Sequence, residues 1–358
     1  MKLLIHSLFL GCLGITISIF GIEKWIVVTT IQYPTEQLRK LNKMSDWHLV
    51  VVGDRKTPSD WYLENCIYLS PSKQMELGYE LASLLPWNHY SRKNIGYLYA
   101  IAQGADLIYE TDDDNEPLEL LNPLKAFNSL PSIKTDQSVV NMYAYFGQPE
   151  VWPRGYPLEN FSSSEKIQLD SETSCHLAIE QGIVNGDPDV DAIYRLTQGK
   201  EVSFQARKSC FLPQGTFCPF NSQNTYFHRD AFFTLYLPSS VSMRVSDIWR
   251  GYIAQRLIWD IGLVVAFSGP NAYQKRNVHS LLRDFTEEYD LYTKSGALIN
   301  FLSNWSSPST SPFESMELLV DSMVENQFLK VEESTLIQAW FRDLKKAQNN
   351  YRGRPLSR

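Results

Sequence analysis

The sequence predicts an α/β fold, a Rossmann-like mixed sheet flanked by helices, with a membrane anchor at the N-terminus and a helical C-terminal end. Short apolar runs alternate with helical segments over the first hundred residues after the anchor, which is typical of a parallel sheet with crossover helices. From residue 281 on the pattern is mostly helical, and residues 334–346 form an amphipathic helix. The 358 residues, 44% of them hydrophobic, suit one large domain with helical additions.

The N-terminus carries a membrane signal. Residues 3–22 contain no formally charged side chain, and such a run is long enough to cross a bilayer as a helix. Lys2 precedes it, whereas Glu23 and Lys24 cancel after it, which favours a cytosolic N-terminus and a lumenal remainder. A cleaved signal peptide is the alternative, but no Ala-x-Ala-like cleavage site follows the run. We therefore expect a signal anchor at residues 1–23.

The next elements follow in order along the chain. Residues 48–54 are a near-continuous apolar run, as a strand buried on both faces requires. Ser91 caps a helix that begins at Arg92 and ends before Gly104. The predicted strands are 25–31, 48–54, 66–70, 106–110, 139–145 and 263–267, and the predicted helices of this part are 38–44, 75–85, 92–103 and 245–259.

Two boundaries and two loops complete the organisation. The main domain is expected at residues 24–305, followed by a helical C-terminal extension at 306–358. Residues 303–312, rich in Ser and Pro, predict a loop between them. Residues 211–225 combine Pro, Gly, amides and aromatic rings, so we expect a loop that lines a site or satisfies its own backbone.

Composition excludes several classes of function. A formal charge of −7 argues against a general nucleic-acid binder. No GxGxxG follows the first strand, so a nicotinamide or flavin cofactor is not expected. The four cysteines after the anchor show no zinc spacing. Cys210 and Cys218 are close enough for a short disulfide loop, and four free thiols are the alternative.

One acidic stretch is the strongest candidate for a site. Asp112, Asp113 and Asp114 directly follow the predicted strand 106–110. Adjacent carboxylates repel one another unless a cation or solvent neutralises them, and open α/β sheets bind ligands beyond the carboxyl ends of their strands. A divalent metal that also binds substrate phosphates suits this place. A solvated acidic turn is the alternative.

Basic residues precede and follow this stretch. Arg92 and Lys93 begin a helix, where the helix dipole disfavours cations. A bound anion would explain them, because helix N-termini and basic side chains attract phosphate; extension into solvent is the alternative. Arg276 and His279 follow a late strand, and there Arg276 is a candidate for diphosphate and His279 for a metal.

Two further groups of acidic residues are candidates for a site. Asp187, Asp189 and Asp191 alternate as in a calcium loop, but Ala192 stands where an EF-hand needs Gly, so an EF-hand is rejected. That turn then either faces an acceptor or the metal, or simply leads into a helix. Ser246 or Asp247 caps the helix 245–259, and the alternative role of Asp247 is that of a base on a substrate hydroxyl.

Several long blocks resemble the STELLO family, Golgi-resident proteins classed as glycosyltransferases and known from plants. The similarity covers residues 24–305, nearly the whole chain after the anchor. The blocks are residues 52–58 (Val-Gly-Asp-Arg-Lys-Thr-Pro), 92–101, 112–115, 187–196, 213–223 and 245–257.

The resemblance implies a single-pass type II protein of the Golgi membrane with a lumenal GT-A domain. Our hypothesis from the residues is the transfer of a sugar from a nucleotide-sugar donor to an unidentified glycan or glycoprotein acceptor, with Mn²⁺ or Mg²⁺ bridging the donor diphosphate. For plant members the resemblance also implies a link to cellulose synthase assembly, and so a partner membrane enzyme. The residues assigned here are Asp112, Asp114 and His279 for the metal, Asp113 for ribose or sugar, Arg92, Lys93 and Arg276 for phosphate, and Asp247 as base in an inverting reaction.

Two other functions are alternatives to this one. A lumenal scaffold would keep the fold and bind a partner enzyme without catalysis. A phosphohydrolase of the aspartyl-phosphate type needs Thr or Val four residues after its nucleophilic Asp, but Glu116 stands there. We therefore expect a metal-dependent glycosyltransferase and retain the scaffold as the alternative.

Overall fold

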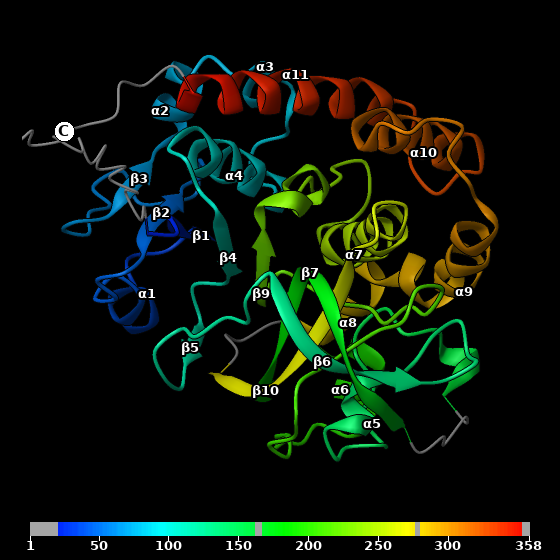
Figure 1. The fold of residues 1–358 in the computed structure, drawn as a ribbon. Helices are drawn as coiled ribbons and strands as arrows, with labels where there is room; N and C mark the ends of the chain where they lie inside the picture. The colour runs from blue at the N-terminus through cyan, green and yellow to red at the C-terminus, as the bar shows by residue number, and fades with distance from the viewer. Residues whose placement is uncertain (1–20, 162–166, 276–279, 353–358) are drawn as a thin grey trace, which may run out of the picture.

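The structure is a computed structural model that describes residues 21–161, 167–275 and 280–352. A large sheet runs through its centre (Figure 1). Its strands are β1 (Lys24–Thr29), β2 (His48–Val52), β3 (Ile67–Leu69), β4 (Leu107–Thr111), β5 (Asn115–Pro117), β6 (Phe127–Lys134), β7 (Gln168–Gly186), β8 (Cys210–Phe211), β9 (Asn224–His228) and β10 (Val264–Gln274).

Helices cover the sheet and form the C-terminal end. They are α1 (Glu36–Leu41), α2 (Pro71–Glu76), α3 (Glu80–Leu84), α4 (Lys93–Ala102), α5 (Met142–Tyr145), α6 (Ala192–Thr197), α7 (Met243–Trp259), α8 (Leu281–Glu287), α9 (Tyr289–Asn304), α10 (Pro312–Glu325) and α11 (Glu332–Arg352). Short 3-10 turns occupy Tyr90–Arg92, Leu158–Asn160 and Arg229–Thr234.

The sheet is mixed, as the sequence predicts. Strands β3, β2, β1 and β4 lie side by side and are parallel. Strand β9 pairs antiparallel with β4 and with β7, and β7 pairs parallel with β10. The chain passes from β1 to β2 and β3 on one side and returns to β4 on the other. The gap between the ends of β1 and β4 is therefore the topological switch point, where open α/β sheets bind ligands.

Both faces of the parallel part are buried, which explains its apolar runs. Ile26 and Val28 pack with α1 on one face, whereas Val27 packs on the other face in the core that includes α4. Gly96 of α4 lies so close to the sheet that a Cβ atom there would come within 2.7 Å of Val27 and of Val52. A glycine at this position lets the helix approach the strands that carry the cleft.

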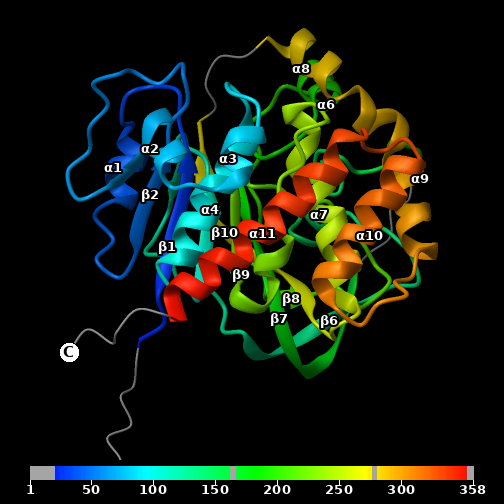
Figure 2. The ribbon, with the colours of Figure 1, turned by 90° about the horizontal axis from the view of Figure 1, so that it is seen from above.

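The helices after residue 305 belong to the same core. Helix α11 lies across α3 and α4, with α10 alongside it (Figures 1 and 2). Trp340 of α11 is fully buried, and the carboxylate of Glu333 accepts hydrogen bonds from Tyr236 and from the backbone of Ser239 and Ser240. The expected helical end is confirmed, and it packs onto the rest of the chain.

Four local predictions were wrong. Ser91 does not cap the helix that follows it: α4 begins at Lys93, with Arg92 at its N-cap and without a side-chain cap hydrogen bond. Residues 139–145 contain helix α5 instead of a strand, because the Asn141 side chain accepts from the Tyr143 N–H and caps a helical turn. The single helix expected at 75–85 is two helices, with Gly78 at φ +66° between them. Helix α7 begins earlier than predicted, and Ser242 caps it in place of Ser246 or Asp247.

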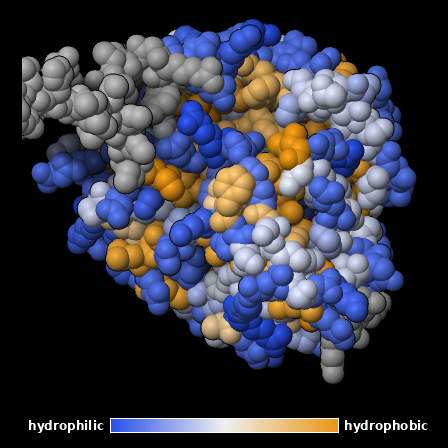
Figure 3. Space-filling model, in the orientation of Figure 1, coloured by the Kyte–Doolittle hydropathy of each residue, from blue (hydrophilic) through white to orange (hydrophobic). Residues whose placement is uncertain are grey.

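The cysteines and the membrane anchor were the remaining expectations. The structure has free thiols instead of the disulfide loop between Cys210 and Cys218. All four cysteines after the predicted anchor are free: Cys66, Cys175, Cys210 and Cys218. The anchor predicted at residues 1–23 lies almost entirely outside the described residues. Across 21–161, 167–275 and 280–352, no helix is long and apolar enough to span a bilayer. On the face drawn in Figure 3, apolar side chains are interspersed with hydrophilic ones.

Candidate functional site

A cleft opens beyond the carboxyl ends of β1, β2 and β4. It encloses about 680 Å³, within the range of ligand pockets (roughly 300–1,000 Å³). Thr30 and Gln32 follow β1, Asp54 follows β2, and the acidic triplet follows β4. Because parallel strands bring their carboxyl ends to one edge, segments far apart in the sequence meet here. The cleft thus lies where the sequence predicted a site.

Asp113 is turned toward the end of β1. Its carboxylate accepts from the Thr30 hydroxyl at 2.5 Å and from the Gln32 amide at 3.1 Å. The Thr35 hydroxyl donates to its backbone carbonyl. Burial raises the pKa of Asp113, although the two side-chain hydrogen bonds oppose the rise. Asp113 thus connects the segment after β4 with the segment after β1 at the switch point.

Asp112 faces the other wall, where α4 begins. The Tyr90 hydroxyl donates to its Oδ1 at 2.9 Å, and Lys93 Nζ lies 3.5 Å from the same oxygen. Burial raises the pKa of Asp112 to about 6, and the Lys93 charge limits that rise. The neighbouring Asp114 and Asp247 raise it further. The site therefore holds more negative charge than its own cations neutralise.

Asp114 is hydrogen-bonded to a series of two amide side chains. Its Oδ1 accepts from Gln274 Nε2 at 2.9 Å, and Gln274 Oε1 accepts from Gln223 Nε2. Because a carboxylate only accepts, this order fixes the orientation of both amides. Gln223 Oε1 is then buried without a partner among the described residues. The carboxylate of Asp114 is thereby held from the side of β10.

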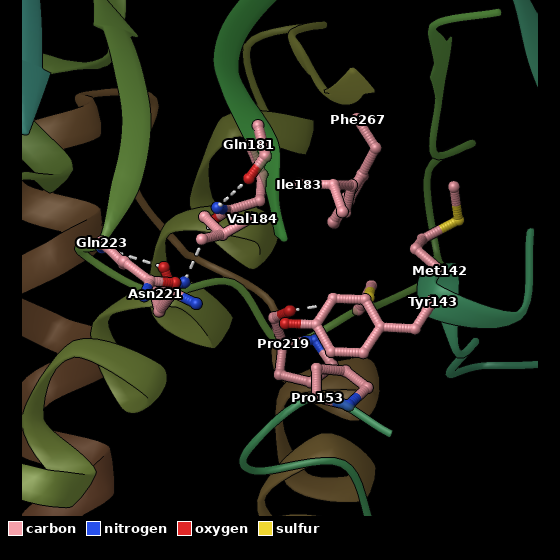
Figure 4. A pocket seen from close by; sticks show the side chains of 12 residues that line it. Met142, Tyr143, Pro153, Gln181, Ile183, Val184, Pro219, Asn221, Gln223 and Phe267 are labelled. Carbon is pink, nitrogen blue, oxygen red and sulfur yellow. Dashed lines mark hydrogen bonds between the residues drawn. The ribbon is translucent and has the colours of Figure 1, made fainter. Parts of the chain in front are cut away.

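Gln223 also lines a small second cavity, which Figure 4 shows. There the Gln223 N–H donates to Asn221 Oδ1, and the Asn221 N–H donates to Gln181 Oε1. In the loop predicted at 211–225, the amides of Gln214 and Asn221 bond backbone groups, one of the two roles expected. The amides of Gln223 and Asn224 donate to other side chains. Through Gln223 that loop forms part of the cleft floor.

Arg92 and Lys93 do not extend into solvent, so that alternative was wrong. The Arg92 guanidinium donates to Gln74 and to the Ala82 carbonyl and stacks on Trp87, 3.8 Å from the ring centroid. Lys93 is fully buried under the acidic loop. Protein acceptors therefore satisfy both cations at this helix start, and phosphate binding by them stays a prediction.

Asp247 lies on the opposite wall and is clamped by an arginine. Arg154 donates to both of its oxygens, at 3.0 and 2.8 Å, and to both oxygens of Asp189, at 2.7 and 2.8 Å. Burial alone would raise the pKa of Asp247, but Arg154 holds it below its ordinary value. Asp247 is thus an ionised carboxylate within the cleft lining.

A buried ion pair joins the two walls. Arg250 of α7 pairs with Glu110 of β4, and both side chains are fully buried. Arg250 also donates to the Ser222 hydroxyl at 2.9 Å, and the Ser222 N–H donates to Asp247. The strand that ends at the acidic loop and the helix that carries Asp247 are therefore held at a fixed spacing.

Comparison with known proteins identifies the family. The model of the STELLO glycosyltransferases matches residues 244–353. The chain is 38% identical over 345 residues to "Probable glycosyltransferase STELLO1" of Arabidopsis thaliana, which covers 91% of this chain and 44% of that protein. It is 37% identical over 350 residues to "Probable glycosyltransferase STELLO2" of the same plant, with 91% and 45% covered. The chain belongs to the STELLO family. It spans less than half the length of these two STELLO proteins.

Some expected site residues of this STELLO-family chain come together and others cannot be placed. Asp112, Asp113, Asp114 and Asp247 line one cleft. Arg276 and His279 lie outside the described residues. In the part of the chain that the structure describes, no three His, Cys, Asp or Glu side chains converge into a metal-binding group.

The sequence analysis missed Arg154, Tyr90 and Gln274. Arg154 stands in an aromatic turn, Trp-Pro-Arg-Gly-Tyr-Pro, whose rings Trp152 and Tyr156 pack in the core. Its partners Asp189 and Asp247 are 35 and 93 residues away. The one local signal for Tyr90 is its place before the cationic helix start. Gln274 had no signal, because only the sheet register brings β10 beside the acidic loop.

Proposed function

We propose that this chain transfers a sugar from a nucleotide-sugar donor to a glycan or glycoprotein acceptor in the cleft beyond β1, β2 and β4. The observation that carries the proposal is the acidic triplet at the switch point of the sheet, inside a cleft of ligand size. Membership of the STELLO glycosyltransferase family supports the same activity.

The acidic loop suits a divalent metal. Carboxylate oxygens are the ligands that Mg²⁺ and Mn²⁺ prefer, and three adjacent carboxylates line the cleft here, with the Lys93 cation 3.5 Å from Asp112. We propose that Asp112 and Asp114 hold Mn²⁺ or Mg²⁺, with His279 completing the set of protein ligands. When bound, the metal supplies Lewis-acid stabilisation of charge on the leaving diphosphate.

The remaining residues of the cleft bind and orient substrate in this proposal. Asp113, fixed by Thr30 and Gln32 at the end of β1, faces the ribose or the sugar. Arg92 and Arg276 contribute positive charge for the diphosphate. In each case the supporting feature is a charge or a fixed acceptor near the strand ends.

Asp247 is the proposed base if the reaction inverts the anomeric centre. A base must be ionised to accept a proton from the acceptor hydroxyl, and the lowered pKa keeps Asp247 ionised. Arg154 fixes the orientation of its carboxylate from the protein side. The same low pKa makes Asp247 a weak base. It therefore accepts the proton of the acceptor hydroxyl only in the transition state, when the hydroxyl is losing it.

We propose further that the chain resides in the Golgi membrane as a single-pass type II protein, anchored by residues 1–23 with the cleft in the lumen. A partner membrane enzyme is part of this proposal. The exposed Asn304 at the end of α9 begins an Asn-Trp-Ser sequon, which suits the lumen. Immunofluorescence with a Golgi marker and glycosidase treatment of the expressed protein test this location.

The activity is tested by incubating the purified chain with a panel of nucleotide sugars, with Mn²⁺ or with EDTA. Donor hydrolysis or transfer that requires Mn²⁺ supports the proposal. Binding of a nucleotide sugar without any turnover supports the scaffold alternative. No binding of any donor contradicts the proposed transfer.

A further inference from the structure

We propose that Lys93 is a built-in counter-ion of the acidic loop, which weakens metal binding to the free protein so that a divalent cation enters together with the nucleotide diphosphate. This inference rests on the proposed function. It gives Lys93 a different role from direct contact with phosphate.

The ammonium of Lys93 is fixed in place. It is fully buried and donates to the Tyr90 hydroxyl at 2.8 Å, to the Thr111 carbonyl at 2.9 Å and to the Ser222 carbonyl at 3.3 Å. A lysine ammonium has three N–H donors, so these acceptors use all of them. No donor remains to reach a phosphate in the cleft.

Its charge nevertheless acts on the site. Asp112 Oδ1 lies 3.5 Å from Lys93 Nζ. The Tyr90 hydroxyl accepts from Lys93 and donates to that same Asp112 oxygen, so it aligns a second dipole with the ammonium. Buried charges are poorly screened by salt. A cation on Asp112 therefore meets a positive charge behind the carboxylate that binds it.

The same charge has the opposite effect on an anion. A diphosphate near the acidic loop is repelled by the three carboxylates and attracted by Lys93. A metal and a diphosphate that arrive together present less net charge to the site than either one alone. Binding of each should therefore strengthen binding of the other, and this coupling is reciprocal.

The charge of Lys93 should have opposite effects on the affinities for the metal and for the nucleotide. Removing the Lys93 charge should tighten binding of a free divalent cation and weaken binding of a free nucleotide diphosphate. At the distances within this site, one buried unit charge changes each affinity by about tenfold or more. Damage to the fold would weaken both.

The test compares Lys93→Gln, which keeps an amide donor without the charge, with Lys93→Arg, which keeps the charge. Mn²⁺ binding is measured by electron paramagnetic resonance without nucleotide, and binding of UDP and of GDP by calorimetry in EDTA. We expect Lys93→Gln to bind Mn²⁺ about tenfold more tightly than the native chain does. We expect it to bind UDP or GDP, whichever the native chain binds, about tenfold more weakly. Lys93→Arg should stay close to the native values.

Two results overturn the inference. They are affinities that Lys93→Gln leaves unchanged, and affinities that it weakens for both the metal and the nucleotide while the variant remains folded by circular dichroism. If Lys93→Gln does not fold, Mn²⁺ binding to the native chain is measured with and without nucleotide instead. Mn²⁺ should bind at least tenfold more tightly with saturating nucleotide than without it, and equal affinities contradict the inference.

The outcomes also separate this inference from the proposed function. If the native chain binds neither Mn²⁺ nor either nucleotide, alone or together, the proposed function fails and the inference fails with it. If it binds them and the charge at residue 93 has no effect, only the inference fails.

Discussion

Two groups of carboxylates share the cleft and differ in what holds them. On one wall, Asp189 and Asp247 are bridged by the buried Arg154, and the pKa of Asp247 is lowered. On the acidic loop, Asp112 and Asp113 are held mainly by hydroxyl and amide donors, and the pKa of each is raised. The residue type is the same, but the Asp247 side chain is 7% exposed and that of Asp112 is 33% exposed. The pKa of Asp247 is lowered in spite of its deeper burial, so the cationic partner decides the direction of the shift.

This difference separates carboxylates that a protein cation already holds from carboxylates that are open to a cation from the ligand. Asp189 and Asp247 share the charge of one buried arginine, and such a buried ion pair is costly to break. A carboxylate with excess negative charge around it gains from an incoming cation. The Arg154 wall therefore shapes the cleft, and the acidic loop is the part ready to bind a cation.

The largest expected effect comes from breaking the Arg154 wall. Arg154→Met leaves two buried carboxylates without their cation, and we expect it to lower the free energy of unfolding by about 3–5 kcal/mol. Urea denaturation measures this. In an Asp189→Asn/Asp247→Asn background the same substitution should cost much less, because no unpaired charge remains. An equal cost in both backgrounds contradicts the assignment of Arg154 as a counter-ion.

A buried carboxylate elsewhere on the sheet sharpens the comparison. Glu180 of β7 accepts from the Leu124 N–H at 2.7 Å, and burial raises its pKa to about 7. Because the folded pKa lies above the unfolded one, the charged form destabilises the protein above pH 7, and stability recovers as the pH falls below it. Glu180→Gln should therefore be more stable than the native chain at pH 8, by at most about 3 kcal/mol.

That advantage should shrink between pH 8 and pH 5, as Glu180 becomes protonated in the folded native chain. Thermal unfolding of both proteins across this range measures it. Asp247→Asn should show no such gain at pH 8, because the pKa of Asp247 is lowered. A pH-independent difference for Glu180→Gln contradicts the raised pKa.

The smallest of these effects concerns the support of Asp114. Gln274→Leu removes the donor to Asp114 Oδ1 and the acceptor for Gln223. Residues that orient a metal ligand typically change metal affinity by about tenfold or more, so Mn²⁺ binding should weaken by about that factor. Gln214→Leu, at an exposed glutamine that bonds the Trp259 carbonyl, is the matched control and should leave Mn²⁺ binding unchanged.

Local patterns predicted much of the fold. The parallel strands followed from apolar runs, and the C-terminal helices from their periodicity. Residues 139–145 failed because a side-chain cap at Asn141 outweighed their β-rich composition. Gly78 and Ser242 moved helix boundaries for similarly local reasons.

The candidate site was predictable only where its residues are contiguous or follow a strand. Asp112, Asp113 and Asp114 could be found because three adjacent carboxylates at a strand end are unusual. The clamp of Arg154 on Asp189 and Asp247 could not, since its members are joined by packing alone. The burial of Arg92 and Lys93 was also hidden, because their acceptors are largely backbone carbonyls, which carry no sequence signal.

The central claim is that the acidic loop binds a divalent cation together with a nucleotide sugar. Calorimetric titration of a nucleotide sugar into the native chain and into Asp112→Ala/Asp114→Ala, with Mn²⁺ and with EDTA, tests it most directly. We predict that the native chain binds the donor far more tightly with Mn²⁺ and that the double variant, folded by circular dichroism, loses this dependence. Unchanged metal-dependent binding in the double variant would contradict the account.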